Sequence, residues 1–207
     1  MDEYWNKRFV NEKLIWGLNP SLVAVESEKI FKMNNIENIL ILGIGYGRNG
    51  KYYIKKGYNV DGIEISIEAI NIGKEFCPEI NFIYGSVLSM DLKKEYDAVI
   101  CYSIIHLFQR QDREIIIENC INHCCKNGLI VISCFSIKDK TFGIGKEIEV
   151  NTFETKPDKI VHFYDRNEME NISNKLELVK LDYSSERIET EKRIDNYEMI
   201  YGLYRKK

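Results

Sequence analysis

Three glycines at alternate positions, Gly43, Gly45 and Gly47, follow a short apolar run and precede a polar segment. Glycine lets the backbone turn tightly and approach a ligand without a side chain between them. The first N–H groups of a following helix favour a polar or anionic ligand. The stretch ILGIGYGRNG therefore predicts a cofactor cradle, and a glycine-rich turn without a ligand is the alternative.

Glu64 ends the next apolar run, NVDGIEI, and follows Gly43 by 21 positions. At this spacing an acid at the neighbouring strand tip can accept hydrogen bonds from both hydroxyls of a ribose. The pair of features predicts a nucleoside ligand. The alternative is a solvated carboxylate after a strand.

The glycines of the stretch ILGIGYGRNG also fit a dinucleotide site. Three of them satisfy G-x-G-x-x-G: Gly45, Gly47 and Gly50. In register with the strand end, however, the third glycine of the pattern falls on Arg48. An Arg48-Asn49 pair at the helix start suits a ligand that carries a carboxylate better than one that carries a pyrophosphate. A nicotinamide-dependent oxidoreductase is therefore the weaker alternative.

A sheet must position these residues. From Glu37 onward, apolar runs alternate with amphipathic segments, which is typical of an α/β fold with helices on both faces of a mostly parallel, Rossmann-like sheet. We expect seven strands, at residues 38–42, 59–65, 81–84, 97–102, 129–135, 176–183 and 197–204. The run 97–102 is continuously apolar, so we place it centrally.

Helices should separate these strands. Ser66 is a suitable N-cap for the helix that stops before Pro78. We also expect a helix at 47–56, one at 113–125 capped by Asp112 and closed by Gly128, and one at 166–174. Asn19 and Pro20 are assigned as N-cap and first residue of an N-terminal helix.

The length of 207 residues favours a single domain, 1–207. Two segments lie outside the alternation: an aromatic N-terminal region, 1–35, expected to form a helical lid, and 136–165, an irregular substrate-side insertion. The insertion leaves the fifth strand at the edge where open α/β sheets bind ligands. Its proposed walls, hinges and polar groups are Phe142, Phe153, Gly143, Gly145, Glu147, Glu149, His162 and Tyr164. A solvent-facing hairpin is the alternative.

Composition limits the partners. The formal charge of −3 gives no basic field for nucleic acid, and no apolar stretch approaches the roughly 20 residues of a membrane span. The six cysteines are few for the length, and the N-terminus lacks a signal-peptide pattern. We expect reduced thiols in the cytoplasm, a small-molecule partner, and a monomer or homodimer.

In order and spacing, the chain resembles the class I S-adenosylmethionine-dependent methyltransferases over about residues 16–135. Within them it is similar to the small-molecule and tellurite-resistance type. The resemblance is carried by Trp16-Gly17, LGIGYGRNG, VDGIEIS, INFIYGSVLSMD, YDAVICYSIIHLF and NGLIVISCF. It implies methyl transfer to a small molecule, with S-adenosylmethionine as cofactor and S-adenosylhomocysteine as product. It also implies that the last strand, in YEMIYGLYRKK, is inserted antiparallel.

The resemblance assigns roles to individual residues. The glycine loop lies under the methionine moiety, Glu64 and Ile65 hold the ribose, and the fourth strand tip, Cys101 to Ser103, faces the methyl group. Ser86 and Val87 edge the adenine. The family often has an acid where this chain has Ser86, so that contact falls to the hydroxyl or the backbone. Trp16, Arg48 and Asn49 complete the expected cofactor set.

Catalytic groups are few, because in-line methyl transfer needs chiefly alignment and exclusion of water. His106, His162 and Tyr164 are the candidates for a general base, with a structural role as the alternative. An idle member of the fold that only binds a nucleoside or a protein partner is a third possibility for the chain.

The cysteines allow two interpretations. Cys120, His123, Cys124 and Cys125 look like a metal cluster, but their helical spacing favours core packing, so we predict no metal. Cys101 and Cys134 lie near the ends of neighbouring strands, where a soft metalloid acceptor is conceivable.

Overall fold

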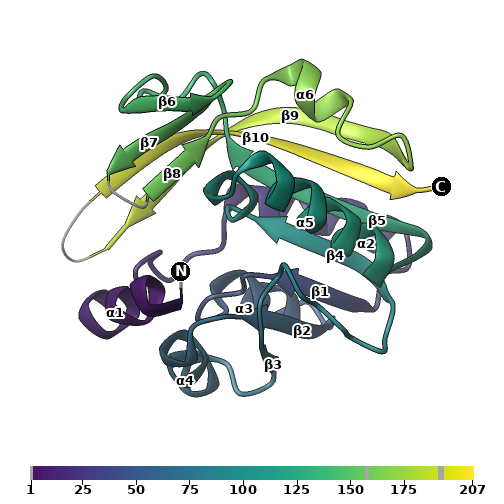
Figure 1. Cartoon of the computed structure of the whole chain (residues 1–207). Coiled ribbons are helices and arrows are strands. Elements are labelled where there is room, and N and C mark those ends of the chain that lie inside the picture. The colour runs from purple at the N-terminus through teal and green to yellow at the C-terminus, as the bar shows by residue number, and fades with distance from the viewer. Residues whose placement is uncertain (1, 157–158, 191–193) are drawn as a thin grey trace.

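The computed structural model describes residues 2–156, 159–190 and 194–207. A seven-stranded sheet of order β3-β2-β1-β4-β5-β10-β9 forms its centre (Figure 1). The first five strands of this order run parallel, and β10 is antiparallel to both β5 and β9. The strands are β1 Asn38–Leu42, β2 Asn59–Glu64, β3 Asn81–Tyr84, β4 Tyr96–Tyr102, β5 Cys124–Phe135, β9 Leu176–Glu189 and β10 Ile194–Lys206. The predicted fold class is confirmed.

Helices cover both faces of the sheet. They are α1 Asp2–Glu12, α2 Leu22–Met33, α3 Arg48–Lys55, α4 Ile67–Phe76, the 3-10 turn η1 Ile105–Leu107, α5 Arg110–His123 and α6 Arg166–Glu170. Phe31 of α2 and Tyr53 of α3 pack with Ile39 on one face, while Ile116 of α5 packs with Leu40 on the other. Alternate residues of β1 thus face opposite cores. β4 is the central strand, as expected.

One helix start is set by its local sequence and another by a distant contact. Ser66 caps α4, because its Oγ accepts from the Ala69 N–H at 3.2 Å. The prediction for Asp112 was wrong: α5 begins at Arg110, whose N–H donates to the distant Glu149 carboxylate at 3.2 Å. That carboxylate supplies the acceptor a local cap would supply.

Two other helix boundaries also differ. α5 ends at His123 and the chain enters β5 at once, so Gly128 lies inside the strand rather than closing a helix. The N-cap of α2 is Ser21, whose Oγ accepts from the Ala24 N–H at 3.1 Å, and not Asn19. Pro20 consequently precedes the helix.

The segment 136–165 is not irregular. It forms a three-stranded antiparallel sheet of β6 Lys146–Glu149, β7 Thr152–Lys156 and β8 Lys159–His162. Phe153, Val161 and Phe163 give this small sheet its own core, against which Phe135 packs. β9 and β10 also extend beyond the predicted strands as one long hairpin.

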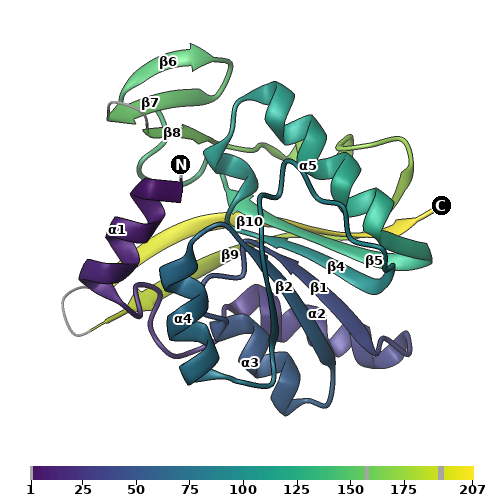
Figure 2. The same ribbon diagram turned by 60° about the horizontal axis from the view of Figure 1, so that its bottom comes forward.

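The small sheet and α1 both lie where the parallel strands of the main sheet end (Figure 1). Figure 2 shows α1 beside α4 on this same side. The carboxyl edge of the sheet, where open α/β folds bind ligands, is therefore flanked by two segments outside the alternating pattern.

Candidate functional site

The glycine loop adopts a backbone that other residues tolerate poorly. Gly43 and Gly45 have φ values of +62° and +60°, in the left-handed region. A Cβ on Gly43 would lie 2.5 Å from Cγ2 of Ile104, so the loop presses directly against the segment that follows β4. The loop between β1 and α3 therefore presents bare backbone at the sheet edge.

Glu64 connects this loop to the end of β2. Its side chain is 5% exposed, and its two carboxylate oxygens accept from the N–H groups of Gly45 and Ser66, both at 2.8 Å. Burial raises the pKa of the Glu64 carboxyl, and the backbone N–H bonds partly oppose that rise. Burial rules out the alternative of a solvated carboxylate. Each oxygen has further lone-pair capacity for a hydroxyl donor.

Helix α1 lies against both loops. Phe9 is buried and its ring stands 3.7 Å from the position of a Cβ on Gly45. Asn6 accepts a hydrogen bond from the Ser66 hydroxyl at 2.7 Å, directly after Glu64. The contact of Asn6 with the α4 N-cap was not predicted, because nothing in the sequence links two positions 60 residues apart.

The segment after α1 meets the start of α3. Arg48 donates from Nη1 to the Trp16 carbonyl at 3.0 Å and from Nη2 to Glu186 of β9 at 3.0 Å. Asn49 accepts from the Ser21 N–H at 2.9 Å. The polar groups expected to meet a ligand carboxylate thus bind the protein itself. The Tyr46 hydroxyl donates a hydrogen bond to the carbonyl of Gly17, the residue that follows Trp16.

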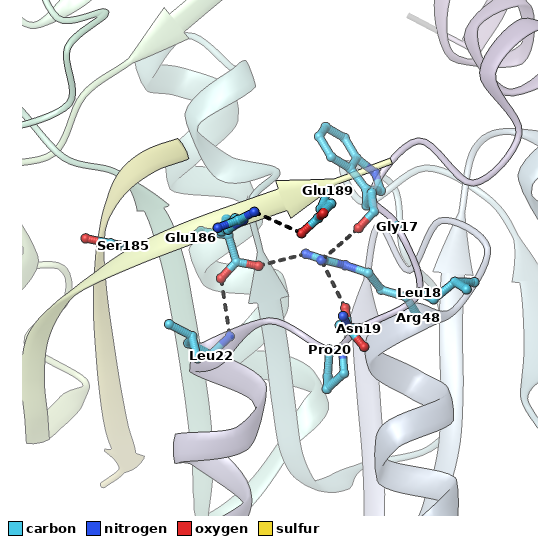
Figure 3. Close-up of a pocket in the computed structure, with 11 residues that line it drawn as sticks. Gly17, Leu18, Asn19, Pro20, Leu22, Arg48, Ser185, Glu186 and Glu189 are labelled. Carbon is cyan, nitrogen blue, oxygen red and sulfur yellow. Dashed lines mark hydrogen bonds and ion pairs between the residues drawn. The ribbon is translucent and has the colours of Figure 1, made fainter. Parts of the chain in front are cut away.

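A cavity of about 260 Å³ opens at this corner (Figure 3). Arg48 and Glu186 cross it, and Glu186 also accepts from the Leu22 N–H at 3.2 Å. The lining is Trp16, Gly17, Leu18, Asn19, Pro20, Leu22, Arg48, Ser185, Glu186, Arg187 and Glu189. The ion pair joins the N-terminal segment, α3 and β9 into one corner.

The expected adenine side lies after β3. Gly85 donates to the Glu64 carbonyl at 3.0 Å, which places the two residues that follow, Ser86 and Val87, next to the β2 end. The Ser86 hydroxyl accepts from the Leu88 N–H at 3.2 Å, and the Val87 carbonyl accepts from Asn119 of α5 at 2.8 Å. Both residues are held by local contacts at the sheet edge.

The side chains at the tip of β4 differ in their burial. Ser103 is exposed and has a φ of +55°, with its N–H donating to the Ser133 carbonyl at 2.8 Å. Such a φ at a non-glycine residue is uncommon. Cys101 is fully buried and contacts the Cys120 thiol. Only the Ser103 end of the tip faces outward.

The buried thiols belong to the core under α5 and α6. The Cys134 Sγ lies 3.7 Å from the Met169 Sδ and 3.7 Å from the Ile200 carbonyl, while Cys101 pairs with Cys120. Burial raises the pKa of the Cys134 thiol well above its usual value. Within 2–156, 159–190 and 194–207, no group of three or more His, Cys, Asp or Glu could hold a metal ion.

His106, His162 and Tyr164 come together where β8 packs on η1. The His162 and Tyr164 rings are 4.5 Å apart, and the His106 ring stacks on Phe135 at 4.3 Å. His162 bonds Thr152 at 2.8 Å through Nδ1 and the Glu168 carboxylate at 2.9 Å through Nε2. Burial lowers the pKa of His106 to about 3, so the ring is neutral near pH 7.

The remaining insertion residues hold the small sheet in place. Glu149 accepts from Arg113 of α5 at 3.3 Å besides capping that helix, and Glu147 accepts from the Asn151 N–H at 3.0 Å. Phe142 and Phe153, the expected pocket walls, make an edge contact at 5.5 Å, in which Phe153 is buried and Phe142 is exposed. The functional neighbours that sequence reasoning missed are Asn6, Phe135, Thr152, Phe163, Glu168 and Glu186.

Comparison with known proteins finds methyltransferases among the chains that are similar to this one. Residues 39–128 match the model of a methyltransferase domain. A ubiquinone biosynthesis O-methyltransferase of Rickettsia akari is 29% identical over 151 residues, which is 69% of this chain and 59% of that protein. The chain thus spans less than two thirds of the length of this relative.

Solved structures share the fold. A structure from work on the conversion of a disulfide bond into a thioacetal group during echinomycin biosynthesis has a TM-score of 0.79 at 17% identity, over 100% of this chain and 91% of that one. TehB from Haemophilus influenzae has a TM-score of 0.67 at 18% identity, over 100% of this chain and 67% of that one.

Fold, glycine loop and buried acid are those of a Rossmann-like domain of the methyltransferase type. The chain is similar to the class I S-adenosylmethionine-dependent methyltransferases, and S-adenosylmethionine is the cofactor of that family. No helix among the described residues has the length and apolar content needed to cross a lipid bilayer.

Proposed function

We propose that the chain transfers a methyl group from S-adenosylmethionine to a small-molecule acceptor. The observation that carries the proposal is the buried Glu64 carboxylate, which binds the N–H of Gly45 in the glycine loop at 2.8 Å. A buried acid fastened to a loop of positive-φ glycines suits a ligand with a diol and a flexible polar tail. The residues present therefore fit the cofactor.

We assign the cofactor contacts on this basis. Gly43, Gly45 and Gly47 lie under the methionine part, Glu64 and Ile65 hold the ribose, and Ser86 and Val87 edge the adenine. S-adenosylmethionine supplies an electrophilic methyl group on a sulfonium, next to the exposed end of β4 at Ser103. Because the side chain of Cys101 faces the core, Cys101 contributes only through its backbone.

In this proposal three of the expected residues do not contact the cofactor directly: Arg48, Asn49 and Trp16. The guanidinium of Arg48 fixes the carbonyl of Trp16 and the carboxylate of Glu186, and Asn49 fixes Ser21. These bonds hold the N-terminal segment against the start of α3. The N-terminal region 1–35 then serves as the cofactor-side lid, with Phe9 over Gly45.

The acceptor enters from the side of the small sheet. The insertion 136–165 packs through β8 on η1, directly after the tip of β4. With α1 on the other side, it shields the reacting atoms from water, which an in-line displacement requires. The similar protein of Rickettsia akari is a ubiquinone biosynthesis O-methyltransferase, which supports a small acceptor for this chain as well.

Calorimetric titration tests the proposal. We expect S-adenosylhomocysteine to bind in the micromolar range and NADH not to bind, because the third dinucleotide glycine is replaced by Arg48. The opposite ranking would restore the oxidoreductase alternative. Transfer of labelled methyl to a panel of small acceptors then separates an active enzyme from an idle nucleoside-binding protein.

The proposal extends to location and assembly. All six cysteines are free thiols, which supports a reducing compartment such as the cytoplasm. A monomer or a homodimer remains our expectation, and light scattering during size-exclusion chromatography measures it.

A further inference from the structure

Tyr46 lies inside the glycine loop, between Gly45 and Gly47, and its hydroxyl reaches the N-terminal segment. The side chain is 1% exposed. Its hydroxyl donates a hydrogen bond to the Gly17 carbonyl and accepts one from the Trp16 N–H at 3.2 Å. Burial raises the pKa of the Tyr46 hydroxyl to about 12, so the hydroxyl keeps its proton and remains a donor near pH 7. A residue of the proposed cofactor loop thus binds two backbone groups of the segment after α1.

Arg48, two residues further on, binds the same segment. Its Nη1 donates a hydrogen bond to the Trp16 carbonyl at 3.0 Å. Gly17 has a φ of +72°, and a Cβ at this position would lie 2.6 Å from the carbonyl oxygen of Glu189 in β9. We call Trp16 and Gly17 the anchor. The glycine loop, Arg48 and β9 all hold this anchor in place.

Helix α1 is joined to the anchor by a cation–π contact. The Arg8 guanidinium lies 4.9 Å from the ring centre of Trp16 and 5.4 Å from that of Trp5. The two indole rings are 6.5 Å apart. Because the face of an indole ring attracts a cation, Arg8 holds α1 to the anchor.

Helix α1 has little packing of its own. Among its eleven described residues only Phe9 is buried, and Phe9 lies against Gly45. Asn6 accepts a hydrogen bond from the Ser66 hydroxyl at 2.7 Å, in the loop after Glu64. A short helix that buries one residue keeps its place through contacts with its neighbours rather than through a core of its own. The anchor and the two loops of the proposed cofactor site therefore set the position of α1.

We infer that Tyr46 is a positioning residue, which couples the glycine loop to α1 through the anchor. The inference rests on the proposed function, because it assumes that S-adenosylmethionine binds on the glycine loop. When the cofactor fixes the loop, Tyr46 and the anchor fix α1 as a wall of the site. This coupling is reciprocal, so loss of the Tyr46 hydroxyl loosens α1 and lowers the affinity for the cofactor. Tyr46 acts in this role without touching the cofactor.

Tryptophan fluorescence tests the coupling. The two tryptophans of the chain are Trp5 and Trp16, and both lie at the contact between α1 and the anchor. Quenching by acrylamide therefore measures how open this contact is. In the wild type, S-adenosylhomocysteine should lower the quenching constant along the same binding curve that calorimetry gives. Without ligand, Tyr46→Phe should be quenched more strongly than the wild type, and saturating S-adenosylhomocysteine should restore the wild-type value.

Tyr53→Phe is the matched control. The Tyr53 hydroxyl is also buried and donates to the Ala24 carbonyl at 3.2 Å, but it joins α3 to α2 instead of the glycine loop to the anchor. Both variants should melt lower than the wild type, since each loses the hydrogen bonds of a buried hydroxyl. Only Tyr46→Phe should change the quenching and raise the dissociation constant of S-adenosylhomocysteine, by about ten-fold. If Tyr46→Phe leaves both values as in the wild type, or if Tyr53→Phe changes both as much, the role of Tyr46 is structural and the inference fails.

A second variant tests the anchor from its other side. Arg48→Lys keeps a positive charge beside Glu186 but loses the planar guanidinium that also binds the Trp16 carbonyl. It should raise the quenching in the same direction, and it replaces Tyr46→Phe if that variant does not fold. Quenching of Arg48→Lys at the wild-type value would contradict the anchor. A wild type that does not bind S-adenosylhomocysteine would overturn the proposed function, whereas one that binds it with unchanged quenching would overturn the inference alone.

Discussion

Replacing Glu64 tests the center of the cofactor site. In Glu64→Ala the ribose hydroxyls lose a charged acceptor whose two oxygens are held by N–H groups at 2.8 Å. Hydrogen bonds to a charged group contribute about 1.5–3 kcal/mol. The affinity for S-adenosylhomocysteine should therefore fall about 10-fold to 150-fold, as isothermal calorimetry would measure.

The carboxylate also has a pH signature. Burial raises the pKa of Glu64 above its ordinary value of 4.5, so between the unfolded and the folded pKa the folded protein holds a proton on this group that the unfolded chain releases. The contribution of the Glu64 carboxyl to the free energy of unfolding is present below pH 4.5 and is lost as the pH rises through the pKa of the folded protein. Cofactor binding needs the carboxylate, so its affinity should fall as the pH is lowered through that same window. Glu64→Gln should abolish this dependence.

A matched control lies on the same strand. Asp61 of β2 accepts from the Tyr96 hydroxyl at 2.8 Å and from Lys94 at 3.1 Å. Asp61→Asn should lower stability while leaving the dissociation constant of S-adenosylhomocysteine unchanged. If Glu64→Ala binds within two-fold of the wild type, Glu64 is only a brace for the glycine loop and our reasoning about the ribose is refuted.

Three further predictions follow from single contacts. Gly43→Ala should cost about 1–2 kcal/mol for the positive φ and more for the 2.5 Å approach to Ile104, whereas Gly57→Ala, with a φ of +93° and open space around it, should show the φ cost alone in urea unfolding. Glu149→Ala should lower stability by about 1–2 kcal/mol through loss of the α5 cap, and Glu147→Ala should change it by far less. Because burial lowers the pKa of His106 from 6.5 to about 3, its contribution is present above pH 6.5 and is lost as the pH falls toward 3. Chemical unfolding at several pH values should show a shallower pH dependence in His106→Phe, and an unchanged slope would contradict the assignment.

The sheet was predictable because each strand is specified locally. The strands 38–42 and 81–84 have the predicted bounds, and β4 is central because its apolar run must be buried on both faces. The position of the glycine loop beside Glu64 was predictable for a similar reason. Glycine spacing and the acid at the end of the next strand are local signals, and parallel neighbours bring them together.

The segments that flank the site were not predictable in detail. The strands of the small sheet are four or five residues long, too short to show a clear period of two, and they themselves contain three lysines and three acids. Arg48 has the chemistry of a ligand-binding residue, and only the fold reveals that Glu186, 138 positions later, is its partner. The cap of α5 by Glu149 has the same origin.

Three carboxylates tie together the segments that flank the proposed site. Glu186 fastens the N-terminal segment to β9, Glu149 fastens the small sheet to α5, and Glu168 fastens β8 to α6. None of these contacts involves the glycine loop or Glu64. The small sheet is tied to α5 and α6, whereas α1 lies against the glycine loop. Residues of the small sheet, on the proposed acceptor side, can therefore vary while the proposed nucleoside side keeps its geometry.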